Sequence, residues 1–130
     1  MREHTKFELT RKLRTKGYPL QQIEAVVDEL ESQNLQSDLR FSINLIRVRR
    51  SKGYGPVYIS NYLREKGVNT KIIESVLDFN DMAWQKALKD AAVKKFGEAR
   101  PAGFKQKARQ MNFLMRRGFS SQQIRDFFDE

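Results

Sequence analysis

Apolar residues recur every three or four positions through most of this chain, which is the spacing that places them on one face of an α-helix. No alternation of apolar and polar residues is long enough to compete as a strand pattern. Together with helix start and stop signals, this pattern predicts an all-α protein. The expected helices cover about 4–16, 20–33, 37–50, 56–66, 70–78, 80–96, 101–117 and 120–129.

The helix predicted over 37–50 carries two apolar stripes. One stripe consists of Phe41, Leu45 and Val48, and the other consists of Leu39, Ile43 and Ile46. A helix that is apolar on two sides is expected to pack between two neighbours. Arg40 and Arg47 lie on the polar strip between the stripes, so the exposed side of this helix is predicted to be basic.

The motif L-x-x-[KR]-G-[apolar] occurs three times. Its glycines, Gly17, Gly67 and Gly118, are 50 and 51 residues apart, and an isoleucine follows each of them by six positions. A left-handed glycine just past a helix end allows the residue after it to pack against the preceding leucine. The same apolar residue can pack against the isoleucine in the first turn of the next helix. Each copy is therefore predicted to end one helix and start another.

Helix caps accompany these motifs. Ser120 with Gln123 forms the pattern of a capping box, and Asn69 is a candidate N-cap. Ser37 or Asp38 is a candidate cap for the third helix. Proline suits the first turn of a helix because its missing N–H has no partner there. We therefore expect the helices over 56–66 and 101–117 to begin at their prolines.

A second correspondence extends the repeat. Asp38 and Phe41 match Asp81 and Trp84 at an offset of 43 residues, so the unit is three helices and about 50 residues long. We predict one repeat domain over 1–130, an elongated, curved array of tandem three-helix repeats whose first repeat is incomplete. The predicted units are approximately 1–34, 35–79 and 80–130.

Composition excludes several function classes. The chain has no cysteine, and its single histidine is His4 near the start. Disulfides, a thiolate nucleophile and cysteine-ligated zinc are thereby excluded, and histidine-based acid–base catalysis is disfavoured. No phosphate-binding glycine motif is present. We predict a non-enzymatic protein without a metal or a cofactor.

The sequence also indicates where in the cell the protein is expected. No run approaches the roughly 18 apolar residues needed to cross a bilayer, and the start lacks the pattern of a secretory signal. We therefore expect a cytoplasmic protein, monomeric and without membrane contact.

The net charge of +9 is concentrated in two blocks. Residues 40–66 contain 7 basic and 1 acidic side chains, and residues 84–119 contain 10 and 2. Nearly neutral or acidic segments separate them. Such a distribution favours binding of a polyanion over a uniformly basic tail. The predicted nucleic-acid or partner-binding residues are Arg40, Arg47, Arg50, Lys52, Tyr54, Arg64, Lys94, Lys95, Lys105, Arg109 and Arg116.

Each of these residue types has a second interpretation. Lys52, with Lys16, Lys66 and Arg117, can balance the partial negative charge at a helix C-terminus. The other basic side chains can belong to a solvated surface. The aromatic residues favour core packing over base stacking, and Tyr54, Tyr58 and Tyr62 can seal the junction between helices.

These motifs together resemble the RecX family of bacterial recombination regulators. The densest match joins Asp38 and Phe41 to R-x-R at 47–49, K-G-Y-G-P at 52–56 and L-x-x-K-G-V at 63–68. Further matches are Trp84, K-K-F-G at 94–97 and F-L-x-x-R-G-F at 113–119. The fuller family pattern has an additional helix before the start of this chain.

The resemblance implies a protein of DNA repair and the SOS response that binds the RecA recombinase assembled as a filament on single-stranded DNA. It implies binding in the filament groove and inhibition of strand exchange, ATP turnover and coprotease activity. Single-stranded DNA is the expected nucleic-acid partner, with double-stranded DNA as a further candidate. The alternative is a general, sequence-independent nucleic-acid-binding module without a dedicated recombinase partner.

Overall fold

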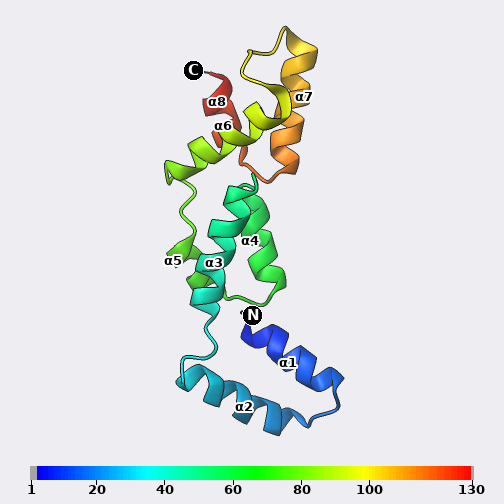
Figure 1. The fold of residues 1–130 in the computed structure, drawn as a ribbon, viewed down its shortest axis with the longest axis vertical. Coiled ribbons are helices and arrows are strands. Elements are labelled where there is room, and N and C mark those ends of the chain that lie inside the picture. The colour runs from blue at the N-terminus through cyan, green and yellow to red at the C-terminus, as the bar shows by residue number, and fades with distance from the viewer. Residues whose placement is uncertain (1–2, 130) are drawn as a thin grey trace. The chain divides into compact units, whose positions relative to one another are not determined.

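The computed structural model describes residues 3–129, and this part of the chain forms eight α-helices and no strand (Figure 1). The all-helical prediction is confirmed. The helices are α1 (Lys6–Thr15), α2 (Leu20–Ser32), α3 (Asp38–Ser51), α4 (Pro56–Glu65), α5 (Thr70–Val76), α6 (Ala83–Phe96), α7 (Phe104–Arg116) and α8 (Ser121–Phe128).

The helices form two compact units. The first unit extends to Asn44 and resumes over Tyr62–Val76, and the second contains Leu45–Asn61 and the chain from Leu77 onward. The unit boundaries fall inside α3 and α4, so they do not follow the repeat of the sequence.

Each of the three repeated glycines ends a helix in the predicted way. Gly17 has a φ of 91°, its N–H donates to the carbonyl of Arg14 at 2.9 Å, and the N–H of Tyr18 donates to the carbonyl of Leu13 at 3.3 Å. The same pair of hydrogen bonds occurs at Gly67 and at Gly118. This pattern is the Schellman motif. The isoleucines six residues later are almost fully buried, with exposed fractions of 1%, 3% and 1% for Ile23, Ile73 and Ile124.

Most predicted caps are also present. Ser120 and Gln123 form the capping box, and the side chain of Asn69 accepts from the N–H of Ile72 at 2.9 Å. Ser37 caps α3 by accepting from the N–H of Arg40 at 3.1 Å, and α4 begins at Pro56.

Two predicted helix starts are wrong. α7 begins at Phe104 rather than at Pro101, because Gly103 has a φ of 110° and the N–H of Ala102 donates to the side chain of Gln106 at 2.8 Å. α6 begins at Ala83, three residues later than expected, because the carboxylate of Asp81 accepts from its N–H at 2.9 Å. Polar side chains thus satisfy backbone donors ahead of both helices.

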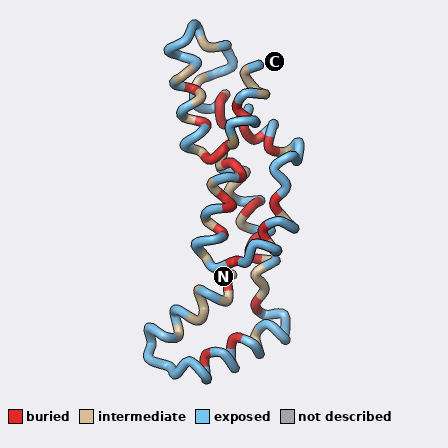
Figure 2. Tube along the Cα trace, turned by 180° about the vertical axis from the view of Figure 1, so that it is seen from behind, coloured by how far each residue is buried: buried red, intermediate tan, exposed pale blue. Residues whose placement is uncertain are grey.

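In the first unit, α1 has no buried residue, whereas Ile23 and Val27 of α2 are buried (Figure 2). Polar contacts anchor the start of α1. Thr5 is fully buried, caps α1 in a capping box, and donates its hydroxyl to the carbonyl of Lys66 at 2.7 Å. Lys6 lies 2.8 Å from the carboxylate of Glu31 in α2, and this hydrogen-bonded pair raises the pKa of Lys6 above its usual value.

The prediction that both apolar stripes of α3 are covered is only partly correct. In the second stripe Ile46 is buried, whereas Leu39 and Ile43 have exposed fractions of 45% and 50%. In the first stripe Phe41 is buried, whereas Val48 is 37% exposed. At the start of α3, polar contacts hold the helix: the carboxylate of Asp38 accepts from the N–H of Lys6 and from the side chain of Gln36.

The core of the second unit is centred on α6. The buried residues of α6 are Trp84, Ala87, Leu88, Ala91 and Ala92. They are complemented by Leu114, Phe119 and Ile124 from α7, the following turn and α8. Small alanine side chains allow neighbouring helices to approach closely. The indole N–H of Trp84 donates to the carbonyl of Asp78 at 2.9 Å, so this buried polar group is satisfied.

Candidate nucleic-acid interface

Residues from both basic blocks of the sequence line one groove in the second unit. This α3–α6 groove has a volume of about 670 Å³ and is formed by the end of α3, one face of α6 and the end of α7. Its cationic lining residues are Arg47, Arg50, Lys52, Lys86, Lys94, Lys95 and Arg117. The acidic residue among the lining is Asp90, which forms an ion pair with Lys86 at 2.9 Å. The groove therefore carries a large excess of positive charge.

The walls of this groove are joined by the K-G-Y-G-P segment. The N–H of Gly55 donates to the carbonyl of Arg117 at 2.8 Å, and the N–H of Val57 donates to the carbonyl of Gly118 at 2.8 Å. A Cβ atom on Gly55 would lie 2.5 Å from the carbonyl carbon of Gly118, so only glycine fits this approach. The two glycine motifs that the sequence presents separately thus meet in space.

Arg117 is the side chain that holds this junction. Its Nε donates to the carbonyl of Gly53 at 3.1 Å, and its terminal nitrogen donates to the carbonyl of Lys52. Its guanidinium lies 4.1 Å from the ring centroid of Tyr54, which stacks on Tyr58 at 4.3 Å. From the sequence, Arg117 is interpreted as a cation that balances a helix C-terminus. Its side chain does contact carbonyls at a helix C-terminus, but at the end of α3 rather than at the end of α7, which Arg117 itself follows.

The remaining cations of the groove differ in their availability. Arg50 is half-buried, with its guanidinium 5.2 Å from the ring centroid of Trp84. Arg47, Lys52, Lys94 and Lys95 are exposed. These four exposed side chains can contact a phosphate group bound in the groove, and the ammonium group of Lys95 also lies 5.8 Å from the ring centroid of Phe113.

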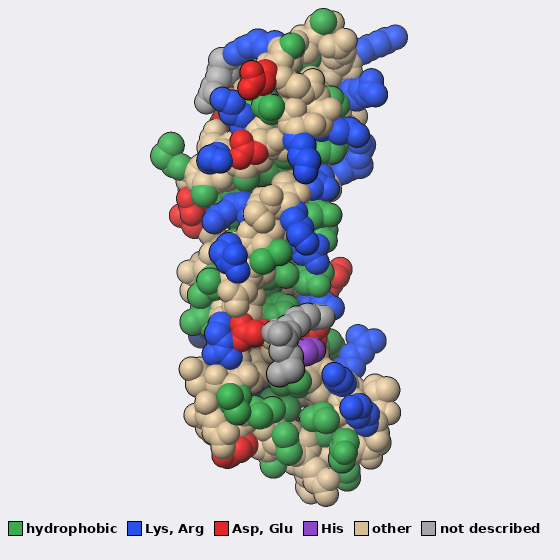
Figure 3. Space-filling model, in the orientation of Figure 1, with side chains coloured by type: hydrophobic (Ala, Val, Ile, Leu, Met, Phe, Trp, Pro, Cys, Tyr) green, Lys and Arg blue, Asp and Glu red, His purple; other side chains and the backbone are tan. Residues whose placement is uncertain are grey.

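The structure places the other predicted binding residues elsewhere. Lys105, Arg109 and Arg116 are exposed on α7 and do not line the α3–α6 groove, although Lys and Arg side chains do gather over α6 and α7 (Figure 3). Tyr54 is half-buried beneath Arg117. Its position supports the interpretation that it seals a helix junction.

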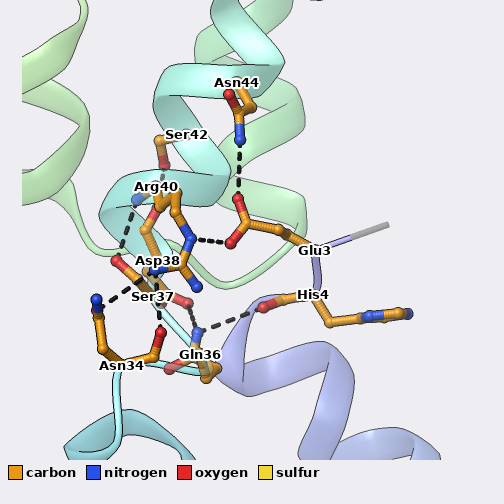
Figure 4. A network of polar contacts seen from close by, with 9 residues as sticks. All are labelled: Glu3, His4, Asn34, Gln36, Ser37, Asp38, Arg40, Ser42 and Asn44. Carbon is orange, nitrogen blue, oxygen red and sulfur yellow. Dashed lines mark hydrogen bonds and ion pairs between the residues drawn. The ribbon is translucent and has the colours of Figure 1, made fainter. Parts of the chain in front are cut away.

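Arg40 and Arg64 belong to the first unit. Arg40 forms an ion pair with Glu3 and donates to the carbonyl of Asn34 at 3.2 Å (Figure 4). Glu3 also accepts from the side chain of Asn44 at 2.8 Å. Arg40 thus has intramolecular partners, which connect α3 to the segment before α1.

The sequence prediction omitted two groove residues, Lys86 and Arg117. Lys86 shares one face of α6 with Asp90 and Lys94 by its spacing of four and eight residues, and this signal was available in the sequence. Arg117 had no such signal, because its partners are backbone carbonyls 64 and 65 residues away. Within residues 3–129, no group of three His, Cys, Asp or Glu side chains is arranged to hold a metal ion.

Three family models match successive segments of the chain. They describe the first, second and third three-helix domains of RecX and match residues 1–30, 37–77 and 84–128. The chain belongs to the RecX family. The residues that line the α3–α6 groove fall mainly in the segments that match the second and third RecX domains.

Relatives with the name regulatory protein RecX match nearly the whole chain. The protein of Stenotrophomonas maltophilia strain K279a is 36% identical over 124 residues, which are 95% of this chain and 76% of that protein. The protein of Pseudomonas entomophila strain L48 is 37% identical over 134 residues, which cover 98% of this chain and 86% of that protein.

Two solved structures have the same fold. A crystal structure of regulatory protein RecX has a TM-score of 0.80 and 22% identity, and the chain covers 65% of its length, less than two thirds. RecX from Lactobacillus salivarius has a TM-score of 0.81 and 20% identity, with 85% of its length covered. Membership of this family indicates a regulatory protein. No helix within residues 3–129 combines the length and the apolar content that crossing a membrane requires.

Proposed function

We propose that this RecX chain is a non-enzymatic regulator that binds the RecA filament on single-stranded DNA and inhibits or modulates strand exchange, ATP turnover and coprotease activity. The observation that carries the proposal is the α3–α6 groove, which combines cations from two sequence-distant blocks and contains one acidic residue. The family name supports a regulatory role rather than a catalytic one. The site of action is the cytoplasm, where a recombinase filament assembles.

The chemistry of the groove suits a phosphate backbone. Lys94 and Lys95 lie on α6, Arg47 lies on α3, and Lys52 directly follows α3, so cations line both walls. Contacts from such side chains to phosphates are independent of base sequence, which is what a regulator of a filament on arbitrary DNA requires. Arg50 and Arg117 contribute charge while their side chains also hold the walls together.

The test compares the wild-type protein with two double variants of equal charge change. The groove variant carries Arg47→Gln and Lys94→Gln, and the α7 variant carries Lys105→Gln and Arg109→Gln. Wild-type protein is expected to inhibit RecA-driven strand exchange and ATP hydrolysis on single-stranded DNA. The groove variant should require roughly ten times more protein for half-inhibition, because each lost charge-assisted contact weakens binding.

The α7 variant serves as the control and also tests the sequence prediction for Lys105 and Arg109. It should inhibit nearly as well as the wild type, since neither residue lines the groove. Equal loss of inhibition in both variants would contradict the proposed position of the interface. Absence of binding and inhibition by the wild-type protein at low salt would rule out the proposed function.

The second candidate function is sequence-independent nucleic-acid binding without a recombinase partner, since the cations of the groove do not by themselves distinguish bare DNA from a filament. A competition experiment separates the two functions. Labelled protein is offered preformed RecA filaments and an excess of bare single-stranded DNA. A regulator of the filament stays on the filament, whereas a general binding module distributes according to the available phosphates.

A further inference from the structure

A second basic groove lies along a different face of α6. This α6–α8 groove has a volume of about 1080 Å³ and is formed by α6, the segment 97–101, α7 and the end of α8. The α6 residues that line it are Gln85, Lys86, Lys89, Ala92 and Val93. Of these, Lys86 alone also lines the α3–α6 groove. Helical periodicity therefore places the two grooves on separate faces of one helix.

The α6–α8 groove has the charge of an anion-binding site. Its cationic lining residues are Lys86, Lys89, Arg100 and Lys107, and its acidic lining residue is Glu98. Lys89 and Lys107 are exposed. An excess of cations along one concave surface raises the local concentration of phosphate-bearing ligands.

Aromatic side chains distinguish this groove from the first one. Phe127 and Phe128 of α8 both line it, with ring centroids 5.0 Å apart in an edge-to-face arrangement. Neither ring is fully buried. The ammonium group of Lys107 lies 5.9 Å from the ring centroid of Phe128, so a cation and an aromatic surface occur at the same point of the groove.

We propose that the α6–α8 groove binds a short segment of single-stranded nucleic acid, with one base stacked on Phe128 and the adjacent phosphates on Lys89 and Lys107. A base that stacks on this ring takes the place of the lysine ammonium group, which then meets the phosphate. Aromatic stacking together with a basic groove is the combination that proteins use for single strands.

The same chemistry disfavours two other ligands. The bases of a duplex are stacked on one another, so a duplex would use the lysines but leave Phe128 without a partner. An acidic peptide without aromatic residues would likewise engage the cations but has no ring to stack on Phe128. This inference goes beyond the proposed function, because binding in the α6–α8 groove requires neither a recombinase nor the α3–α6 groove.

The experiment measures binding of the full chain to bare oligonucleotides, without RecA. Three probes are compared: a single-stranded oligothymidylate, an abasic oligonucleotide of the same length, and a duplex. The variant Phe128→Leu keeps an apolar side chain but removes the aromatic ring. It should lose roughly tenfold affinity for the oligothymidylate, the effect of one lost stacked base, and bind the abasic and duplex probes as the wild type does.

Two further variants make the result specific. Phe104→Leu removes an aromatic ring that is 86% exposed but does not line the groove, and it should leave all three affinities unchanged. Lys89→Gln should reduce the log–log salt slope for the oligothymidylate by about 0.7, the value for one phosphate on a single strand. This exposed lysine can be replaced without disturbing the core.

Three outcomes would overturn the proposal. One is an equal loss of affinity for the base-bearing and abasic probes in Phe128→Leu, which would mean a purely structural role of the ring. Another is binding of the oligothymidylate that is unchanged in both Phe128→Leu and Lys89→Gln. The third is displacement of the oligothymidylate by polyglutamate as efficiently as by unlabelled oligothymidylate. Loss of recombinase inhibition has no bearing on these measurements, so this proposal and the proposed function fail separately.

Discussion

At the scale of single residues, one arginine performs two tasks. Arg117 donates to the carbonyls of Lys52 and Gly53 and covers the ring of Tyr54, while its charge adds to the α3–α6 groove. The adjacent Arg116 is exposed and lines neither groove. Two neighbouring side chains of the same type thus have different roles because only one of them points at a helix end.

Arg117→Lys is expected to lower the free energy of unfolding of the second unit by about 1–3 kcal/mol. Lysine keeps the charge but cannot donate to two carbonyls in a fixed fork and stack flat on a ring. Urea unfolding followed by the fluorescence of Trp84, the single tryptophan, reports on this unit. The control Arg116→Lys should stay within about 0.5 kcal/mol of the wild type. Indistinguishable effects of the two substitutions would refute the assigned role of Arg117.

At the scale of elements, each helix end is specified locally, but some caps also carry tertiary contacts. The capping box of α8 uses Ser120 and satisfies backbone donors of its own helix. The capping box of α1 uses Thr5, whose hydroxyl also donates to the carbonyl of Lys66 at 2.7 Å. The α8 box also carries a tertiary contact, because the side-chain amide of its other member, Gln123, donates to the carbonyl of Phe79 at 3.0 Å. The two boxes differ in which member makes that contact: the N-cap residue in α1, and the third residue of the helix in α8.

Ser120→Ala is expected to destabilise α8 by about 1 kcal/mol through the lost cap. Thr5→Ala should cost about 2 kcal/mol, because the carbonyl of Lys66 also loses its partner. Amide hydrogen exchange measures both effects separately, in α1 for the first structural unit and in α8 for the second. Thr15→Ala, an exposed control, should change protection little. If Thr5→Ala were no more costly than Ser120→Ala, the tertiary role of Thr5 would be wrong.

At the scale of the whole molecule, the net charge of +9 is less informative than its distribution. In the first unit, Glu3 engages Arg40, and Glu31 engages Lys6. In the second unit, the cations of the α3–α6 groove have one acidic neighbour, Asp90. Charges that are balanced within the fold add little to ligand binding, whereas clustered charges in a concave surface determine its salt dependence.

Binding to single-stranded DNA should therefore weaken steeply with salt. Neutralisation of four phosphates by Arg47, Lys52, Lys94 and Lys95 in the α3–α6 groove contributes about −3 to the log–log slope. The groove variant, which lacks two of these cations, should make the slope shallower by about 1.5. Fluorescence anisotropy over a range of salt concentrations measures both values. The α7 variant should keep the wild-type slope; a shallower slope in that variant would place phosphates on Lys105 or Arg109 instead.

Features that depend on neighbours in the chain could be predicted from the sequence. The glycine-terminated helices, the caps at Asn69 and Ser120 and the burial of Ile23, Ile73 and Ile124 follow from backbone sterics and helical periodicity, which act over a few residues. The predicted starts of α6 and α7 failed where side chains such as Gln106 compete for backbone donors.

The α3–α6 groove depended on contacts between distant segments. The sequence by itself determined that residues 40–66 and 84–119 are basic. Only the tertiary structure decided which of those cations share a concave surface, because Gly55 and Gly118 bring their backbones together. The same packing left Lys105 and Arg109 outside the groove. It also placed the side chain of Arg117 where it donates to the carbonyl of Gly53 and joins the walls of the groove. Charge is a property of each residue, whereas a binding surface requires the close approach of helices that the sequence separates.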